Sequence, residues 1–487
     1  MGTRRIGPHS QPVASDARTV SRAALPRVIS RRLQPSEHRA VLAAGDAVAA
    51  IAAVILALWL WSIPAGWRFS QGLLTGHLWW FTAAGLWLVV AAFPAGPSSI
   101  ALSLRRTVVA LLRGAAILLV GYGAWYFYAP KGVLPRLVVL YFLWEALLLT
   151  FAWRLVFVFI FSQPRFRRRA IVVGSGRPAA LAVATVREDR GHPVLIVGIV
   201  RERDGDAAPD VPHVSEDRLI ETAAAGGVSE LILALSGPPP EALLKTLLAC
   251  QEAGAQVVRV QTLVEQSLRR IPVDHLEPDW LMTELADAVR LGEASWIAKR
   301  LLDIAGALAG AIVFVLATPF IALLIRVDSR GPIFYRQRRA GRGGTPFTVL
   351  KFRTMTPDAE RPGEAKWAGR DDPRTTRVGR VLRKTRLDEL PQFLNILKGD
   401  MSLVGPRPER PEFVEQLQEA IPFYRARLLV PPGLTGWAQV NLPYGDSVDA
   451  ARAKLEYDLY YVKHRSILFD LAIVVRTAGA VARLGGH

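Results

Sequence analysis

The chain has 487 residues, of which 51% are hydrophobic and 21% charged, so it is long enough for several domains and too apolar to be mainly disordered. Lysine and arginine outnumber aspartate and glutamate by 60 to 42, and the formal charge of +18 favours anionic partners such as lipid headgroups or phosphorylated substrates. A single cysteine, Cys250, and scattered histidines exclude a disulfide framework and a cysteine-rich zinc site.

The N-terminal third is predicted to be a membrane region. Residues 1–40 contain eight arginines and no long aliphatic run, which predicts a basic flexible arm rather than a signal peptide. Residues 41–162 then hold four apolar segments, each of roughly the length that crosses a bilayer. These predicted transmembrane helices are 42–63, 77–95, 107–128 and 137–161.

The distribution of arginines predicts the orientation of these helices. Arginines crowd the N-terminal arm, recur at Arg105 and Arg106, and return directly after the fourth segment, whereas the other two loops hold few cations. The positive-inside rule therefore places the N-terminus and the chain after residue 163 in the cytoplasm. Within the bundle, Asp46 and Arg113 lie at similar predicted depth, which favours either an ion pair between them or separate extension of both side chains to the headgroups.

Residues 163–290 alternate short β-like and helix-like runs, a pattern that predicts a Rossmann-like domain with a parallel sheet. The first turn reads Gly174-Ser175-Gly176-Arg177-Pro178-Ala179, a G-x-G-x-x-A sequence between a strand and a helix. A tight turn needs glycine whether or not a nucleotide binds. Nucleotide binding and a purely structural turn therefore both remain open.

A fifth apolar run, 301–325, is long enough to cross the bilayer but has cations at both ends. Lys299 and Arg300 precede it and several arginines follow it, so a crossing would export a cationic segment. Pro319, after Thr318, removes a backbone hydrogen bond and favours a break in the helix. We predict a re-entrant helix whose two ends stay on the cytoplasmic side, with a kinked spanning helix and a buried core helix as alternatives.

Motifs rich in arginine, proline and glycine follow between residues 350 and 441. They are Lys351-Phe-Arg-Thr-Met355, Asp372-Pro-Arg374, Arg383-Lys-Thr-Arg-Leu-Asp-Glu-Leu-Pro-Gln392, Gly399-Asp-Met-Ser-Leu-Val-Gly-Pro-Arg-Pro408 and Pro432-Gly-Leu-Thr-Gly-Trp-Ala-Gln-Val-Asn441. Asp388 and Glu389 before Pro391 are compatible with an ordinary helix start. They are also compatible with a phosphate-handling site, because Arg383 and Arg407 carry forked donors that suit phosphate oxygens.

With these motifs, residues 296–487 resemble the bacterial sugar transferases, specifically the long form of the monotopic phosphoglycosyl transferases. The resemblance implies an α/β membrane protein with four transmembrane helices, a Rossmann-like domain at 163–290 and a catalytic domain at 291–487 anchored by a re-entrant helix. It implies that the helix break lies at Thr318 and Pro319. Thr318 stands where the family usually has serine, but it still offers a hydroxyl to the backbone.

The resemblance also implies the roles of individual residues. Asp388 would be the nucleophile and Glu389 its dyad partner, and both would contact Mg²⁺. The residues implied to bind phosphate are Arg383, Arg407, Lys351 and Arg353. The identity of the sugar stays open, because Asn441 is followed by Leu-Pro-Tyr-Gly where many relatives have Gly-Arg.

The implied activity is transfer of a hexose-1-phosphate from a UDP-hexose to polyprenyl (undecaprenyl) phosphate, with release of UMP through a covalent sugar-phosphoryl aspartate. This would be the first membrane step of exopolysaccharide, capsule or O-antigen synthesis, at the cytoplasmic face of the bacterial inner membrane. Membrane lipids are expected partners, nucleic acid is not, and a homodimer stays open. The alternative, a membrane-anchored nucleotide-sensing protein, leaves the motifs between 383 and 408 unexplained.

Overall fold

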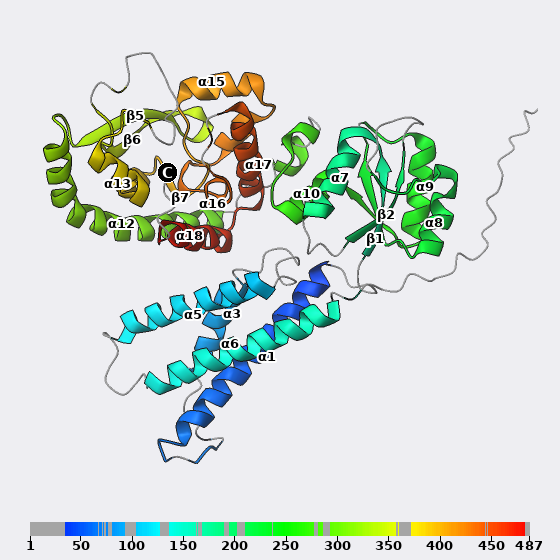
Figure 1. Ribbon diagram of the computed structural model, residues 1–487, viewed down its shortest axis with the longest axis horizontal. Coiled ribbons are helices and arrows are strands. Elements are labelled where there is room, and N and C mark those ends of the chain that lie inside the picture. Colours follow the sequence, from blue (N-terminus) through cyan, green and yellow to red (C-terminus); the bar gives the residue numbers. More distant parts are fainter. Residues whose placement is uncertain are drawn as a thin grey trace, which may run out of the picture.

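The computed structural model describes residues 35–482 with internal gaps, so the predicted basic arm lies almost wholly outside the described residues. The gaps are 67, 71, 73–74, 76–79, 93–103, 127–135, 162, 164–167, 189–193, 202–209, 236, 277–280, 286–292, 357–358, 360–371, 444 and 446. Figure 1 shows two α/β units side by side and a group of helices below them.

The group of helices corresponds to the predicted membrane region. Its helices are α1 (Pro35–Ser62), α3 (Phe81–Ala92), α5 (Leu104–Tyr126) and α6 (Arg136–Phe161). Among the described residues, Ala40–Ser62 and Leu137–Phe161 are long and apolar enough to cross a membrane, while α3 has only 12 residues and the apolar part of α5 is shorter than a span. Each of the four apolar segments thus contains a helix in its described part, and two of these helices have spanning length.

A buried ion pair joins α1 to α6. Arg154 donates from Nη2 to Asp46 Oδ2 at 2.7 Å and from Nε to Oδ1 at 3.3 Å, and the two side chains are 3% and 6% exposed. Next to this pair, Trp153 packs directly against Gly45 and donates to the carbonyl of Leu42. Arg154 therefore contacts both carboxylate oxygens of Asp46, whereas the Arg113 side chain lies outside the described residues, so the predicted pair of Asp46 with Arg113 stays a prediction.

The first α/β unit has the parallel sheet that the alternating pattern predicted. Its elements are β1 (Arg168–Gly174), α7 (Gly176–Glu188), β2 (Val194–Val200), α8 (Leu219–Gly226), β3 (Glu230–Ala234), α9 (Glu241–Glu252), β4 (Gln256–Arg259) and α10 (Val260–Leu268). The strands run parallel in the order β2-β1-β3-β4, with α7 and α10 on one face and α8 and α9 on the other (Figure 1). A Cβ on Gly174, which has φ 137°, would lie 2.0 Å from the Ala234 carbonyl oxygen, so close approach of β3 explains this glycine.

The second α/β unit contains the motifs between 350 and 441. Its elements are α12 (Glu293–Asp328), β5 (Phe334–Ala340), β6 (Pro346–Phe352), α13 (Arg377–Thr385), α14 (Gln392–Lys398), β7 (Ser402–Val404), α15 (Pro411–Ala420), β8 (Gly433–Thr435), α16 (Trp437–Asn441), α17 (Val448–His464) and α18 (Ile467–Ala482). Strands β5 and β6 form an antiparallel hairpin, and β7 pairs with β8 in parallel. A buried core built around Tyr424, Leu455 and Leu459 joins α15, α17 and α18.

Helix α12 follows the edge of this unit and contacts it at both ends. Near its start, Arg300 donates to the carbonyls of Ile396 and Leu397 at 2.7 and 2.8 Å. At its end, Asp328 accepts from the backbone N–H of Val378 at 2.9 Å. Figure 1 shows the helix curving around the unit rather than running straight.

Two features of α12 bear on its predicted membrane role. Pro319 lies inside the helix, and the hydroxyl of Thr318 donates to the Phe314 carbonyl at 2.6 Å, a bond that favours bending. Several apolar side chains of α12 face outward, with Phe320 73% and Val327 80% exposed, which does not fit a buried core helix. Residues Ser295–Asp328 are long and apolar enough to cross a membrane, so length alone does not distinguish spanning from re-entrance.

Helix α12 packs closely on α14 through a glycine, which gives a prediction for stability. A Cβ on Gly310 would lie 2.3 Å from the ring of Phe393, so Gly310→Ala should lower the unfolding free energy by about 1–3 kcal/mol. Gly479→Ala in α18 is the control, because a Cβ there meets nothing within 4 Å. Thermal unfolding in detergent measures both variants. Equal melting temperatures for the Gly310 and Gly479 variants would show that α12 is not packed on α14 as described.

The two α/β units touch through α17. Glu265 of α10 accepts from Lys463 at 3.0 Å and from His464, and Arg270 pairs with Glu456 at 3.2 Å. The backbone takes part as well, since the N–H of Ile271 donates to the Glu456 carbonyl at 3.0 Å. Helix α17 therefore belongs to the core of the second unit on one side and to the contact with the first unit on the other.

Candidate active site

A sharp turn between α13 and α14 presents the two adjacent carboxylates. Arg386 adopts φ 57° at the end of α13, and the chain then forms a short 3₁₀ turn, Leu387–Glu389, before α14 begins at Gln392. Asp388 and Glu389 are 8% and 7% exposed. The two acidic residues thus belong to a separate turn rather than to the first turn of α14, and both are largely buried.

Glu389 is surrounded by cations. Its Oε1 accepts from Lys351 Nζ at 3.0 Å and from Arg407 Nη2 at 2.8 Å, and Arg386 Nη1 lies 3.7 Å from Oε2. Burial alone would raise its pKa, but Arg407, Lys351 and Arg386 hold the pKa of Glu389 well below its usual range. Glu389 is therefore ionised, and it fixes the positions of Lys351 and Arg407.

Asp388 has a different environment. Within the described part of the chain, its carboxylate has neither a hydrogen bond nor an ion pair. Burial and the neighbouring charge of Glu389 raise the pKa of Asp388 to about 6, although Lys351, Arg383 and Arg407 act in the opposite direction. Asp388 is thus a buried carboxylate that lies near cations yet keeps both oxygens available to a ligand.

The fold brings together five of the six residues predicted to act in catalysis or phosphate binding. The Arg383 guanidinium is held by two hydroxyls, donating from Nε to Thr354 Oγ1 at 3.1 Å and from Nη1 to Thr375 Oγ1 at 3.4 Å. The residues that the structure groups around the turn are Asp388, Glu389, Lys351, Arg383 and Arg407. These residues come from β6, α13, the 3₁₀ turn and the segment after β7.

Arg353 does not join this group. Its guanidinium donates to the carbonyl of Ser329 at 2.7 Å and to the carbonyl of Arg330 at 3.0 Å, just beyond the end of α12. Burial lowers its pKa, and Arg326 acts in the same direction. The structure therefore gives Arg353 a role in fixing the C-terminal end of α12. Thr318 and Pro319 also lie outside the group, inside α12, which continues through both residues.

The carboxylates offer a partial site for a divalent cation. Among the described residues there is no cluster of three or more histidine, cysteine, aspartate or glutamate side chains. Mg²⁺ commonly binds to one or two carboxylates together with substrate phosphates. Asp388 fits this pattern, whereas Oε1 of Glu389 is already shared by two cations, so Oε2 is the atom that Glu389 could offer.

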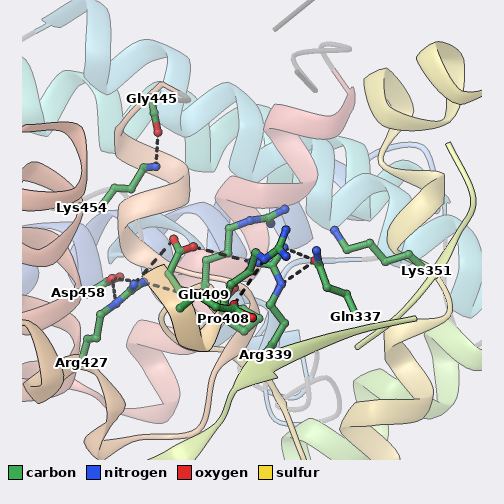
Figure 2. A network of polar contacts seen from close by, with 12 residues as sticks. Gln337, Arg339, Lys351, Pro408, Glu409, Arg427, Gly445, Lys454 and Asp458 are labelled. Atoms are coloured by element: carbon green, nitrogen blue, oxygen red, sulfur yellow. Dashed lines mark hydrogen bonds and ion pairs between the residues drawn. The ribbon is translucent and has the colours of Figure 1, made fainter. Parts of the chain in front are cut away.

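A polar network beside the turn was not found from the sequence. Its members are Gln337, Arg339, Glu409, Tyr424, Arg427 and Asp458, most of which Figure 2 shows around the segment that follows Arg407. Arg427 and Asp458 form its buried centre, with Nη2 to Oδ2 at 2.8 Å, and burial raises the pKa of Asp458 to about 6. One signal was present: on β5, Arg339 lies on the same face as Tyr335, the residue that pairs with Lys351 on β6.

Several known proteins are similar in sequence to this chain. A family model described as bacterial sugar transferase matches residues 294–484. The chain is 42% identical over 234 residues to a UDP-N-acetylgalactosamine-undecaprenyl-phosphate N-acetylgalactosaminephosphotransferase of Aeromonas hydrophila, covering 47% of this chain and 53% of that protein. It is 32% identical over 339 residues to an undecaprenyl-phosphate glucose phosphotransferase of Komagataeibacter xylinus, covering 67% and 62%.

A third relative matches a shorter part of the chain. This UDP-glucose:undecaprenyl-phosphate glucose-1-phosphate transferase of Caulobacter vibrioides is 45% identical over 184 residues, covering 37% of this chain and 67% of that protein. The chain thus spans about half to two thirds of the length of these three curated relatives. The Komagataeibacter match is longer than the family match, so the likeness to that protein extends beyond the second unit.

Proposed function

The chain belongs to the bacterial sugar transferase family, and from this we propose that it transfers a hexose-1-phosphate from a UDP-sugar to undecaprenyl phosphate, releasing UMP. The observation that carries the proposal is the buried Asp388 carboxylate, which keeps its oxygens available beside Lys351, Arg383 and Arg407. An anionic nucleophile among fixed cations suits attack on a diphosphate. The reaction would be the first membrane step in the synthesis of a surface polysaccharide.

In the first half-reaction, a carboxylate oxygen of Asp388 attacks the phosphorus that carries the sugar. The new O–P bond forms as the bond to UMP breaks in line, and UMP leaves with the electron pair. Arg407 and Lys351, held by Glu389, together with Arg383 stabilise the charge on the phosphoryl oxygens. When bound at Asp388 and Glu389, Mg²⁺ would neutralise part of the diphosphate charge.

In the second half-reaction, an oxygen of undecaprenyl phosphate attacks the same phosphorus. The bond to Asp388 breaks, and the carboxylate is restored as the polyprenyl diphospho-sugar leaves. Asp388 needs to be ionised in both steps, which its pKa of about 6 allows at neutral pH. The alternative of a nucleotide-sensing protein gains no support, because close approach of β3 already explains Gly174.

The acceptor lies in a bilayer, so the proposal includes a membrane arrangement. We propose that α12 enters the inner membrane and returns to the cytoplasmic side, and that α1, α3, α5 and α6 form the four spans of an N-terminal bundle. Support for re-entrance comes from three features: both ends of α12 contact the same unit, its outward side chains are apolar, and cations flank both ends. The second α/β unit would then lie on the cytoplasmic face.

Thiol labelling tests this topology. In a Cys250→Ser background, Ser295→Cys and Arg330→Cys place single thiols at exposed positions near the two ends of α12. Both should stay unlabelled by a membrane-impermeant reagent in whole cells and react after permeabilisation. Labelling at 330 but not at 295 in whole cells would mean that α12 spans the membrane, and the cytoplasmic placement would be wrong.

The activity itself is tested with purified protein in detergent or nanodiscs. A panel of UDP-sugars is supplied with and without undecaprenyl phosphate, and UMP release is measured. We expect one donor or a few related donors to give sustained release only when the acceptor is present, with at most one UMP per protein in its absence. Absence of release with every UDP-hexose and N-acetylhexosamine would contradict the proposed function.

A further inference from the structure

The segment Pro406–Glu409 carries Arg407 and is fixed through its carbonyl groups. Prolines at 406 and 408 have no N–H, so this stretch has few donors of its own. Each of its four carbonyl oxygens nevertheless accepts a hydrogen bond. In chain order, the donors are Gly433 N at 2.9 Å, Arg427 Nη2 at 2.9 Å, Arg339 Nη1 at 3.1 Å and Ala340 N at 2.8 Å.

Among these four donors, Arg427 contributes a buried side chain, and two further hydrogen bonds fix the orientation of its guanidinium. It donates from Nε to Asp458 at 3.0 Å and from Nη1 to the hydroxyl of Tyr424 at 2.8 Å. The same group reaches the Arg407 carbonyl through Nη2. Because Asp458 is 2% exposed and compensates the charge, Arg427 acts as a rigid donor rather than a free cation.

Arg339 supports the next carbonyl from the opposite side. Its Nε and Nη2 both donate to Gln337 Oε1, which leaves Nη1 for the carbonyl of Pro408. Figure 2 shows Arg339 between Gln337 and Pro408, and Arg427 beside Asp458. The Glu409 carboxylate lies 3.8 Å from both guanidinium groups and so joins the two supports.

We propose that Arg427, assisted by Arg339, is a positioning residue that fixes the backbone at Arg407 and so holds the Arg407 guanidinium at Glu389. The proposal rests on the proposed function, in which Arg407 contacts the diphosphate of the donor. Among the described contacts, neither Arg427 nor Arg339 pairs with Asp388 or Glu389, so their effect on the reaction passes through Arg407. A displacement of about 1 Å at such a group can cost as much as a hundredfold in rate.

The test uses Arg427→Lys, which keeps a positive charge for Asp458 but cannot also reach Tyr424 and the Arg407 carbonyl. In full-length protein, kcat/KM for the UDP-sugar should fall by about tenfold or more. In an Arg407→Gln background, the same Arg427→Lys change should lower kcat/KM less than twofold, because the group that it positions is gone. Arg425→Lys is the control. Arg425 lies in the same 3₁₀ turn as Arg427, Tyr424–Leu429, but donates from Nη1 to Gln418, so this change should leave kcat/KM unchanged.

A second measurement does not depend on activity. Hydrogen exchange of a peptide covering residues 402–413 should be faster in the Arg427→Lys protein than in the wild type or the Arg425→Lys protein. The inference is overturned if exchange in this peptide does not change, or if Arg427→Lys lowers kcat/KM by the same factor in both backgrounds. If the wild-type protein releases no UMP from any donor, the proposed function fails, and the exchange result alone decides the positioning role.

Discussion

Replacing Asp388 with asparagine is expected to lower turnover with undecaprenyl phosphate by roughly a thousandfold or more, because an amide is a far poorer nucleophile than a carboxylate. The substitution keeps the size of the side chain and leaves the Glu389 contacts with Lys351 and Arg407 in place. Stability should therefore change little, and the loss would lie in the chemical step. UMP release under saturating donor and acceptor measures the effect.

Intact-protein mass spectrometry supplies the second readout for Asp388. With donor alone, the wild-type protein should gain the mass of one hexose phosphate, whereas the Asp388→Asn protein should not. Asp400→Asn is a matched control, because Asp400 pairs with the exposed Lys398 away from the turn. Near-wild-type turnover in the Asp388→Asn protein, or an adduct on it, would remove Asp388 as the nucleophile.

The second large effect is expected in the N-terminal bundle. Arg154→Gln leaves the buried Asp46 carboxylate without its cation and should lower the unfolding free energy by about 3–5 kcal/mol. Asp46→Asn combined with Arg154→Gln should be less damaging than the sum of the two single changes, because no uncompensated charge remains. Thermal unfolding in detergent measures the cycle.

A parallel cycle with Arg113 separates the observed pair from the one predicted from sequence. Asp46→Asn and Arg113→Gln should be additive, since Arg154 occupies both oxygens of Asp46. Additivity between Asp46 and Arg154, with coupling between Asp46 and Arg113, would show that the ion pair between α1 and α6 is not formed.

The ion pair of Asp46 with Arg154 shows what a hydropathy pattern leaves undetermined. Counting residues along predicted spans gives the depth of a side chain, but the direction in which each helix face points depends on packing. On α6, Trp153 packs against Gly45 and the adjacent Arg154 reaches Asp46 of α1, which residue counting does not indicate. The alternation of β and α runs predicted the parallel sheet of the first unit, because that pattern is local, whereas the strand order β2-β1-β3-β4 depends on crossovers that the pattern does not specify.

In the candidate site too, residues that are close in sequence were predicted together, whereas several contacts between distant parts of the chain were not. Asp388, Glu389 and Arg383 lie within one short stretch, and their grouping with Lys351 and Arg407 agrees with the motifs. Arg353, which the resemblance implied to bind phosphate, follows the end of β6 at Phe352 and contacts the carbonyls of Ser329 and Arg330 instead. Arg339 and Arg427 were missed because their contacts with the Arg407 segment join parts of the chain that no spacing rule connects.

Helix α17 contacts both α/β units, and this limits how the two units can be recombined in evolution. Its residues Glu456, Lys463 and His464 pair with Arg270 and Glu265 of the first unit, while Asp458 on the same helix supports Arg427. Deleting or exchanging the first α/β unit would leave these charged side chains without partners on a helix that also supports the segment carrying Arg407. Relatives that lack the first unit are therefore expected to carry compensating changes along one face of α17.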